Sequence, residues 1–285
     1  MIRDLSIFGL MGFPLGHSLS PFIHNTVYKY LSINGVYTLF QIEENKLTDA
    51  FNALKVLNIK GMNITIPYKE KALSYLDEIS DEAQSIGAVN TIVNDKGFLK
   101  GYNTDYMGFG KSLKVNNIDI INKDIFLIGA GGAARSVALY LLKNNARVHI
   151  FGRNPQKISN FKKFFENKFR NIVSYDLNDI GSNLRSVKPY MIINCTPSGM
   201  KGNLSTLSLN PDDIKGNVDV FYDLVYNPLK TQFMALGDMC SCKVVSGIDM
   251  LLLQAFEAIY IWTGRTIDYE YGKHLLEREG LIKNM

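Results

Sequence analysis

Residues Ile125–Arg135 read IFLIGAGGAAR. The first four residues form an apolar run typical of a buried strand, and the small and apolar residues after the glycines have helical spacing. Gly129, Gly131 and Gly132 let the backbone turn sharply and approach a phosphate, and the helix that follows directs its free N–H groups at that phosphate. Ala134 occupies the third glycine position of the G-x-G-x-x-G/A pattern, where a methyl group fits. The stretch therefore predicts a dinucleotide-binding turn between a strand and a helix.

The chain on both sides of this turn alternates strand and helix patterns. We expect strands at 125–128, 147–151, 190–194 and 220–224, and helices at 133–143 and 155–165. Such alternation is typical of a parallel, doubly wound α/β sheet. The change of pattern predicts a domain boundary near residue 105.

The end of the second strand indicates which dinucleotide binds. An NAD site needs an acidic residue about 20 residues after the glycines to hold the ribose 2′-hydroxyl. The sequence has no carboxylate from Val148 to Lys157, and Arg153 lies at the tip of the strand. A guanidinium matches a 2′-phosphate, so the pattern favours NADP over NAD. The alternative is that Arg153 is a solvated loop arginine.

The part of the chain before residue 105 has a different pattern. We expect strands at 5–12 and 36–42, and helices at 21–34 and 47–57. Ser20 before Pro21 predicts an N-cap with proline at the first helical position. A hairpin is expected over 88–102, with its turn at 94–97, and Asn103-Thr104-Asp105 opens another helix.

The stretch Gly61–Lys69, GMNITIPYK, carries a possible proton donor. Apolar residues at 62, 64 and 66 alternate with Asn63 and Thr65, which predicts a half-buried strand ended by Pro67. Lys69 then falls in the first turn of a helix predicted over 69–79. A lysine at the positive end of a helix dipole tends to have a lowered pKa, which suits a proton donor. The alternative is a solvated surface lysine.

Composition excludes several classes of protein. The chain has 285 residues, 46% of them hydrophobic and 20% charged, and a formal net charge of +4 from 31 Lys+Arg and 27 Asp+Glu. This balance does not favour nucleic-acid binding. The N-terminus does not resemble a signal peptide, and the apolar stretch 250–262 is too short to span a membrane. Three cysteines and four scattered histidines, among them His17 and His24, show no metal-ligand spacing, and the cysteines favour a reducing cytoplasm.

Several separated stretches together resemble one family. They are GFPLGHSLSPFIHN (12–25), NITIPYKE (63–70), IGAVNT (86–91), GYNTD (101–105), GAGGAAR (129–135), NCTPSGM (194–200), YDLVYNP (222–228) and SGIDMLLLQAFEAIYIW (246–262). In this order, and over nearly the whole chain, they are similar to the shikimate dehydrogenases. The resemblance implies reversible reduction of 3-dehydroshikimate to shikimate by NADPH, a step in aromatic amino acid biosynthesis.

The resemblance also implies a domain organisation and a set of site residues. An α/β substrate domain, residues 1–104 completed by the C-terminal helices at 248–285, would enclose an inserted Rossmann domain that binds NADP, residues 105–247. Lys69 would be the acid/base residue, with Asp105 beside it. The substrate would contact Ser18, Ser20, Thr65, Asn90, Asp105, Tyr226 and Gln254. The cofactor would contact Gly129, Ala130, Gly131, Gly132, Ala133, Gly152, Arg153, Asn154, Lys157, Leu224 and Gly247.

The chemistry supports these roles and leaves alternatives. Ketone reduction needs a hydride from the cofactor and a proton from a positioned acid. We interpret Lys69 and Asp105 as a coupled pair, although Asp105 would also serve as a plain helix cap. Ser20 would either bind the substrate carboxylate or only cap its helix.

One departure from the family concerns the strand tip. The family commonly has Asn-Arg-Thr there, and this chain has Gly152-Arg153-Asn154, so the strength of the NADP preference is open. The alternatives are a quinate/shikimate dehydrogenase with relaxed cofactor use and a non-catalytic NADP-sensing module. We expect a monomer or homodimer that binds a small-molecule substrate and no metal, nucleic acid or membrane.

Overall fold

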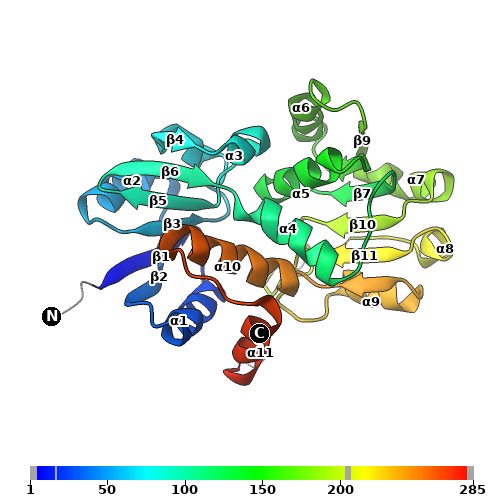
Figure 1. Cartoon of the computed structure of the whole chain (residues 1–285). Helices are drawn as coiled ribbons and strands as arrows, with labels where there is room; N and C mark the ends of the chain where they lie inside the picture. Colours follow the sequence, from blue (N-terminus) through cyan, green and yellow to red (C-terminus); the bar gives the residue numbers. More distant parts are fainter. Residues whose placement is uncertain (1–4, 17, 203–206, 281–285) are drawn as a thin grey trace. The chain divides into compact units, whose positions relative to one another are not determined.

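The chain forms two compact units. A computed structural model describes residues 5–16, 18–202 and 207–280. Unit 1 comprises Met1–Gly108 and Leu252–Met285, and unit 2 comprises Phe109–Leu251 (Figure 1). The chain passes from one unit to the other within helix α4 (Thr104–Val115) and again within helix α10 (Ile248–Thr263).

Unit 2 contains a six-stranded parallel sheet in the order β9-β8-β7-β10-β11-β12. Its strands are β7 (Asp124–Ile128), β8 (Arg147–Gly152), β9 (Ile172–Asp176), β10 (Met191–Asn194), β11 (Val220–Asp223) and β12 (Lys243–Val245). The predicted doubly wound sheet is confirmed, and its order is that of a Rossmann domain. Strand β7 lies between β8 and β10, so β8 and β9 are added on one side of it and β10, β11 and β12 on the other. The strand order therefore reverses at β7, which leads into the glycine turn.

The helices of unit 2 pack on this sheet. They are α5 (Gly132–Lys143), α6 (Pro155–Glu166), α7 (Ile180–Val187), α8 (Pro211–Ile214) and α9 (Gln232–Met239), with a 3-10 turn η3 (Leu177–Asp179). Figure 1 shows α5 in front of the strands. In one core cluster of this unit, Phe126, Phe151 and Phe221 of the strands are fully buried and pack against apolar residues of α7, α8 and α9. Because the strand interiors are apolar on both faces, their positions were predictable from the sequence.

Unit 1 contains a mixed six-stranded sheet in the order β2-β1-β3-β5-β6-β4. Its strands are β1 (Ser6–Gly12), β2 (Gly35–Gln41), β3 (Gly61–Ile64), β4 (Glu78–Ile79), β5 (Thr91–Asp95) and β6 (Phe98–Tyr102). Strands β1, β2 and β3 are parallel, whereas β5 is antiparallel to β3 and β6. The predicted hairpin is confirmed, and Lys96 and Gly97, both at positive φ, form its tip.

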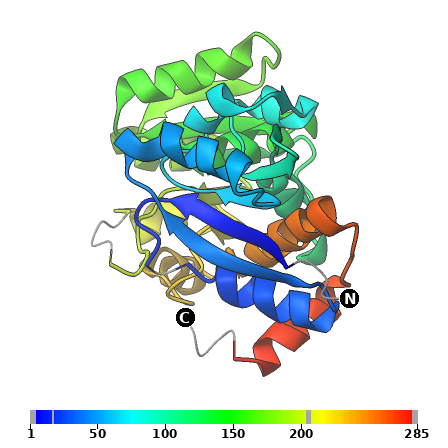
Figure 2. The same cartoon turned by 90° about the vertical axis from the view of Figure 1, so that its left-hand side faces the viewer.

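The helices of unit 1 are α1 (Ser20–Tyr30), α2 (Leu47–Val56), α3 (Asp81–Ile86), the first residues of α4, most of α10, and α11 (Tyr269–Arg278). A 3-10 turn η1 (Glu44–Lys46) precedes α2. Figure 2 shows β1 and β2 side by side, with α1 next to them. Phe51 and Leu54 of α2 join the apolar cluster that includes Met62 and Ile64 of β3.

Two local predictions in unit 1 are wrong. Strand β3 ends at Ile64 and is buried on both faces, so Asn63 is 6% exposed, whereas Ile66 is 63% exposed. No α-helix begins at Lys69. A 3-10 helix, η2 (Lys71–Tyr75), follows it instead, and its short length offers a weak dipole to Lys69. Apolar residues at helical spacing did not distinguish one 3-10 turn plus a short strand from an α-helix.

The start of α1 also differs from the prediction. The helix begins at Ser20, the N-cap position is Leu19, and the helix has no side-chain cap. The backbone N–H of Ser20 donates to Oγ of Ser18 at 3.2 Å. Ser20 is therefore not the cap, and Ser18 supplies the hydroxyl that turns the chain into the helix.

Trp262 fixes α10 on the sheet of unit 1. Its indole N–H donates to the carbonyl of Ile92 at 2.9 Å, and its ring stacks on Phe8. A methyl group added at Gly61 would lie 2.3 Å from Nε1 of Trp262, so only glycine permits this approach. His24 is fully buried and stacks on Tyr37 with ring centroids 4.0 Å apart, so it packs in the core of unit 1. His17 lies outside the described residues.

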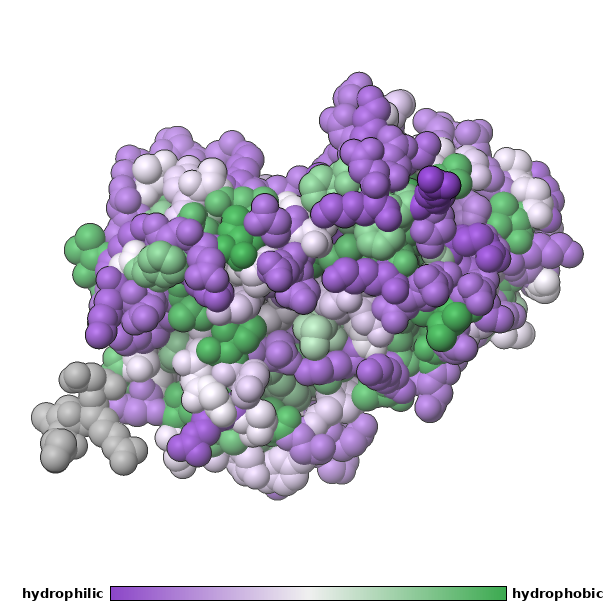
Figure 3. Space-filling view, turned by 45° about the horizontal axis from the view of Figure 1, so that its top comes forward, coloured by the Kyte–Doolittle hydropathy of each residue, from purple (hydrophilic) through white to green (hydrophobic). Residues whose placement is uncertain are grey.

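The surface in Figure 3 is largely hydrophilic, with apolar side chains in scattered patches. In the described ranges, no helix combines the length and apolar character that crossing a membrane requires.

Candidate active site

Lys69 and Asp105 form an ion pair within unit 1. Nζ of Lys69 donates to Oδ2 of Asp105, and the two side chains are 15% and 8% exposed. The backbone carbonyl of Lys69 accepts from the N–H of Val89 at 2.8 Å, which holds the lysine beside the segment that leads into β5. The predicted pair is therefore assembled. The lysine lies in the loop after β3 and not at the start of a helix, as the sequence had predicted.

Asn90 lies next to this pair. Its Nδ2 donates to Oδ1 of Asp105 at 2.9 Å and to Oγ1 of Thr104 at 3.0 Å. Its Oδ1 accepts from the backbone N–H of Thr104 at 2.7 Å. Asn103 supplies the cap of α4, because its Oδ1 accepts from the N–H of Tyr106 at 3.2 Å. Asp105 is thus free of capping and engages Lys69.

Thr104 connects Asn90 to Gln254. Its hydroxyl lies 3.4 Å from Oε1 of Gln254 on α10 and 3.2 Å from the hydroxyl of Thr91. Asn63 of β3 extends the network, since its Nδ2 donates to Oγ1 of Thr91 at 3.0 Å. Asn63, Asn90, Thr91, Thr104 and Asp105 are buried, and Gln254 is half-buried. Each has a hydrogen-bond partner, so the network holds Asn90, Asp105 and Gln254 together.

Sequence reasoning missed the threonines of this network. Thr91 and Thr104 are at most 1% exposed. The available signal was that two Asn-Thr pairs, at 90–91 and 103–104, each stand at the start of an element. Their pairing across the hairpin depends on strand register, which the sequence alone does not show.

Ser18, Ser20 and Thr65, predicted to bind the substrate, follow the carboxyl ends of β1 and β3. Ser18 and Ser20 are half-buried at the start of α1. Thr65 follows β3, and its N–H donates to the carbonyl of Met11 at 2.9 Å. A methyl group at Gly12 would lie 2.4 Å from Cγ2 of Thr65, so β1 and the loop after β3 approach closely here. Both loops follow the carboxyl ends of adjacent parallel strands, β1 and β3.

The glycine turn of unit 2 has the geometry that a pyrophosphate needs. Gly129 has φ +112°, a conformation that favours glycine, and α5 begins at Gly132. Around Gly131, a methyl group would meet no atom within 4 Å, so the backbone is open to a ligand. Ala134 is fully buried where α5 packs on the sheet. These residues fit a dinucleotide, whose phosphates would lie at the helix N-terminus.

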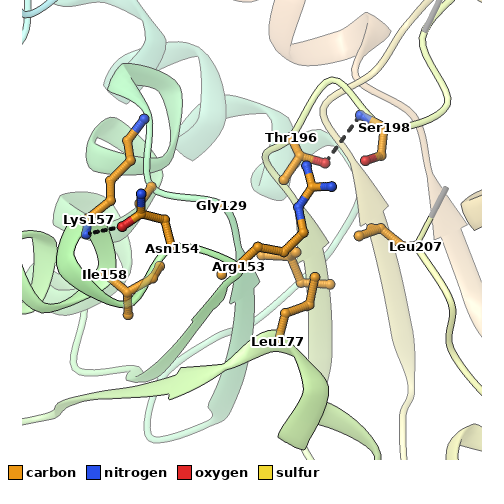
Figure 4. A pocket seen from close by; sticks show the side chains of 12 residues that line it. Gly129, Arg153, Asn154, Lys157, Ile158, Leu177, Thr196, Ser198 and Leu207 are labelled. Carbon is orange, nitrogen blue, oxygen red and sulfur yellow. Dashed lines mark hydrogen bonds between the residues drawn. The ribbon is translucent and has the colours of Figure 1, made fainter. Parts of the chain in front are cut away.

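A pocket lies beside this turn, at the carboxyl ends of the strands of unit 2. Its lining residues are Ile128, Gly129, Ala130, Gly152, Arg153, Asn154, Lys157, Ile158, Leu177, Thr196, Ser198 and Leu207 (Figure 4). Figure 4 shows the guanidinium of Arg153 near Thr196. Among the described residues, the lining contains two cations and no carboxylate, so its electrostatics suit a ribose 2′-phosphate.

Gly152, at the end of β8, departs from the asparagine that the family commonly has there, and the packing of Ile158 explains it. A methyl group at Gly152 would lie 2.4 Å from Cδ1 of Ile158, so glycine leaves room for this side chain under the pocket. Asn154 caps α6, with its Oδ1 accepting from the N–H of Lys157 at 3.0 Å. Arg153 and Lys157 are the two cationic side chains of the lining, and these are the groups suited to an added phosphate.

Three further residues that were predicted to contact the substrate or the cofactor follow β11 and β12 in unit 2: Leu224, Tyr226 and Gly247. A methyl group at Gly247 would lie 2.2 Å from the carbonyl oxygen of Leu224, which shows how closely these segments approach. Tyr226 is half-buried, and burial raises the pKa of its phenol. Tyr226 belongs to unit 2, whereas the other predicted substrate residues belong to unit 1.

Asp223 is a buried carboxylate that sequence reasoning did not single out. It is fully buried at the end of β11, and burial raises the pKa of its carboxyl to about 6. The signal in the sequence was an acidic residue directly after an apolar strand. In the described part of the chain, no cluster of three or more His, Cys, Asp and Glu side chains has the arrangement of a metal site.

Comparison with known families identifies both ends of unit 1. A model described as "Shikimate dehydrogenase substrate binding domain" matches residues 10–92. A second, described as "Shikimate 5'-dehydrogenase C-terminal domain", matches residues 247–277.

Individual relatives cover nearly the whole chain. A Clostridium perfringens protein (strain SM101 / Type A) named shikimate dehydrogenase (NADP(+)) is 41% identical over 275 residues, which is 96% of this chain and 98% of that protein. The structure of shikimate 5-dehydrogenase from Thermus thermophilus, in complex with NADP(H) and shikimate, is similar with a TM-score of 0.84 and 31% identity, covering 96% and 99% of the two chains. Quinate dehydrogenase from Corynebacterium glutamicum in complex with NAD gives a TM-score of 0.86 at 25% identity, covering 97% and 100%. This chain belongs to the shikimate dehydrogenase family of oxidoreductases.

Proposed function

We propose that this protein catalyses the reversible reduction of 3-dehydroshikimate to shikimate with NADPH. The observation that carries the proposal is the Lys69–Asp105 pair, held by Asn90 and Thr104 in the unit that matches the substrate-binding family model. The relatives named for this reaction with NADP support the choice of substrate and cofactor.

Lys69 is the proposed proton donor in the direction of ketone reduction. Reduction leaves an alkoxide that must receive a proton, and an ammonium group is a suitable donor when it is directed at that oxygen. Asp105 fixes the direction of the ammonium through Oδ2, while Asn90 holds Oδ1. In the reverse direction, neutral Lys69 would accept the proton of the substrate hydroxyl.

The remaining substrate ligands provide orientation. Ser18 and Ser20, at the start of α1, are the proposed partners of the substrate carboxylate, because hydroxyls and a helix N-terminus suit an anion. Thr65, Asn90 and Gln254 are the proposed partners of the ring hydroxyls. Tyr226 is a further proposed contact.

The cofactor supplies the hydride when bound. The glycine turn at 129–133 is the proposed pyrophosphate site, and Arg153 and Lys157 the proposed 2′-phosphate site, with Gly152 and Asn154 beside them. Leu224 and Gly247 are the proposed neighbours of the nicotinamide. We propose residues 1–104 and 248–285 as the substrate domain, and 105–247 as the cofactor domain.

The test is an absorbance assay at the nicotinamide band, with shikimate and quinate each combined with NADP+ and NAD+. We expect turnover with shikimate and NADP+ to exceed each of the other three combinations. Absence of turnover with shikimate, despite tight NADP+ binding, would favour the NADP-sensing module.

A second candidate function is oxidation of quinate with relaxed cofactor use. The observation that favours it is Gly152, which contributes no polar side chain to the 2′-phosphate site, together with the similarity to a quinate dehydrogenase that binds NAD. The two cations Arg153 and Lys157 in the pocket lining argue against a strong NAD preference. Comparable turnover of quinate with NAD+ in the same assay would establish this second candidate.

The setting of the enzyme is also a proposal. The three cysteines are free thiols, which supports a reducing cytoplasm as the compartment. The proposed assembly is a monomer or homodimer, and sedimentation velocity would distinguish the two.

A further inference from the structure

Asn194 and Asp223 end two neighbouring strands of unit 2 and are paired in register. Both side chains are fully buried. The carboxylate of Asp223 accepts from three neutral donors: Nδ2 of Asn194 at 2.9 Å, the backbone N–H of Val225 at 3.0 Å and Oγ1 of Thr231 at 2.6 Å. A buried carboxylate satisfied in this way joins the end of β10 to the loop between β11 and α9.

The Asn194 side of this cluster shapes the loop after β10. Oδ1 of Asn194 accepts from the N–H and the hydroxyl of Thr196, at 3.0 and 2.6 Å. Oγ1 of Thr196 in turn accepts from the N–H of Ser198 at 3.2 Å, a bond drawn in Figure 4. Thr196 and Ser198 both line the cofactor pocket. A methyl group at Gly129 would lie 3.0 Å from Cγ2 of Thr196, so this loop also packs against the glycine turn.

Thr231, on the other side of the cluster, supports the same loop after β10. Thr231 caps α9, with Oγ1 accepting from the N–H of Met234 at 3.1 Å. A methyl group at Gly199 would lie 3.3 Å from Cβ of Thr231, so the loop after β10 rests on this residue. The bond from Val225 to Asp223 fixes the segment that contains Leu224.

We propose that Asp223 is a positioning residue for the cofactor, whose carboxylate holds residues 194–199 and 224–231 in the conformation that forms the Thr196–Ser198 wall of the pocket. The inference rests on the proposed function in taking the bound molecule to be a nicotinamide dinucleotide. Asp223 itself is fully buried and acts through the loops. Losing its bonds would therefore weaken cofactor binding and leave the chemistry of bound cofactor unchanged.

The first test is Asp223→Asn, measured in the full-length protein. The oxygen of the new amide still accepts from Asn194 and Val225, but its NH2 group faces Thr231, so the hydroxyl of Thr231 loses the acceptor that Oδ2 provides in the wild type. We expect the Kd for NADP+, measured by calorimetry without substrate, to rise about tenfold. At saturating NADPH, kcat should stay within about twofold of wild type, as should the KM for 3-dehydroshikimate.

The second test uses the partner residue. Thr231→Val keeps the shape and removes the hydroxyl, and should weaken NADP+ binding as Asp223→Asn does. Thr231→Ser keeps the hydroxyl and should restore wild-type affinity. Asp268→Ala is the matched control, because it removes the cap of α11, where Oδ1 accepts from the N–H of Tyr271 at 3.0 Å in unit 1. This control should lower Tm without changing the Kd for NADP+.

Two results would overturn the inference. One is that Asp223→Asn and Thr231→Val lower Tm as the control does while the Kd for NADP+ stays within about twofold. The other is that kcat falls and the Kd is unchanged. Binding of NADP+ and of NAD+ is measured without substrate, so the test of Asp223 does not depend on turnover. If the wild-type protein binds a cofactor but does not reduce 3-dehydroshikimate, the proposed function is refuted. The effect of Asp223→Asn on cofactor binding would still be measured in that case.

Discussion

Asn90 and Asp105 are joined by a hydrogen bond of 2.9 Å, from Nδ2 of the amide to Oδ1 of the carboxylate. Lys69 donates to the other carboxylate oxygen. Both hydrogens of the Asn90 amide are engaged, the second by Thr104. A residue proposed to bind substrate thus also fixes the carboxylate that directs the proposed acid.

Asn90→Ala should lower kcat about 100-fold, because Asp105 would lose the bond that sets its direction. The free energy of unfolding should fall by about 1–3 kcal/mol, since the buried N–H of Thr104 loses its acceptor. Asn94→Ala is the control: Asn94 is 4% exposed in β5, which begins directly after Asn90, and its amide donates to the backbone carbonyls of Leu54 and Ile59. Steady-state kinetics and urea unfolding measure both quantities. An equal loss of kcat in both variants would show that stability alone was affected.

Lys69→Met should lower kcat by about 10²–10⁴-fold, the range expected for removing a general acid. Methionine keeps most of the apolar stem of lysine and removes the ammonium. The Kd for NADP+ should hardly change, because Lys69 lies in unit 1 and the cofactor pocket in unit 2. Lys71→Met, at an exposed lysine paired with Glu44, should keep wild-type kinetics. Wild-type turnover in Lys69→Met would remove the lysine from the mechanism.

Arg153→Ala should weaken NADPH binding about 10–100-fold, which is the strength of hydrogen bonds to a charged group. NADH binding should change little, because NADH has no 2′-phosphate. The comparison is the ratio of kcat/KM for the two cofactors. Arg170→Ala, at an exposed arginine in the same unit, should leave this ratio unchanged. Equal weakening of both cofactors by Arg153→Ala would contradict the 2′-phosphate role.

The sequence predicted those elements whose own residues determine their secondary structure. Strands β7, β8, β10 and β11 are apolar runs, and the glycine turn specifies its own geometry. Strands β9 and β12 were missed, because they are edge strands with polar residues and β12 has only three residues. Their pairing depends on neighbouring strands, a tertiary effect that local propensity does not contain.

The site was predictable to a similar degree. Lys69 and Asp105 are 36 residues apart, and the resemblance to a family, not local pattern, placed them together. Thr104 and Asp223 were missed because their roles depend on which buried groups the fold brings next to them. Ser20 was assigned a capping role from its sequence position, but the bond belongs to Ser18.

Asp223 should make the stability of unit 2 depend on pH. Burial raises the pKa of its carboxyl from 3.8 to about 6, so the folded state binds the proton more tightly than the unfolded state. The stabilisation linked to this proton is complete below about pH 4 and is lost as pH rises through 6. Between pH 4 and pH 7.5 this linkage should lower the free energy of unfolding by about 2 kcal/mol.

The difference in unfolding free energy between Asp223→Asn and wild type isolates this effect, because other titrating groups cancel in the difference. As pH rises from about 4.5 to 7.5, this difference should change in favour of Asp223→Asn by about 2 kcal/mol. The lost bond to Thr231 adds an offset that does not vary with pH. A pH-independent difference for Asp223→Asn would mean that the carboxyl titrates alike in the folded and unfolded protein.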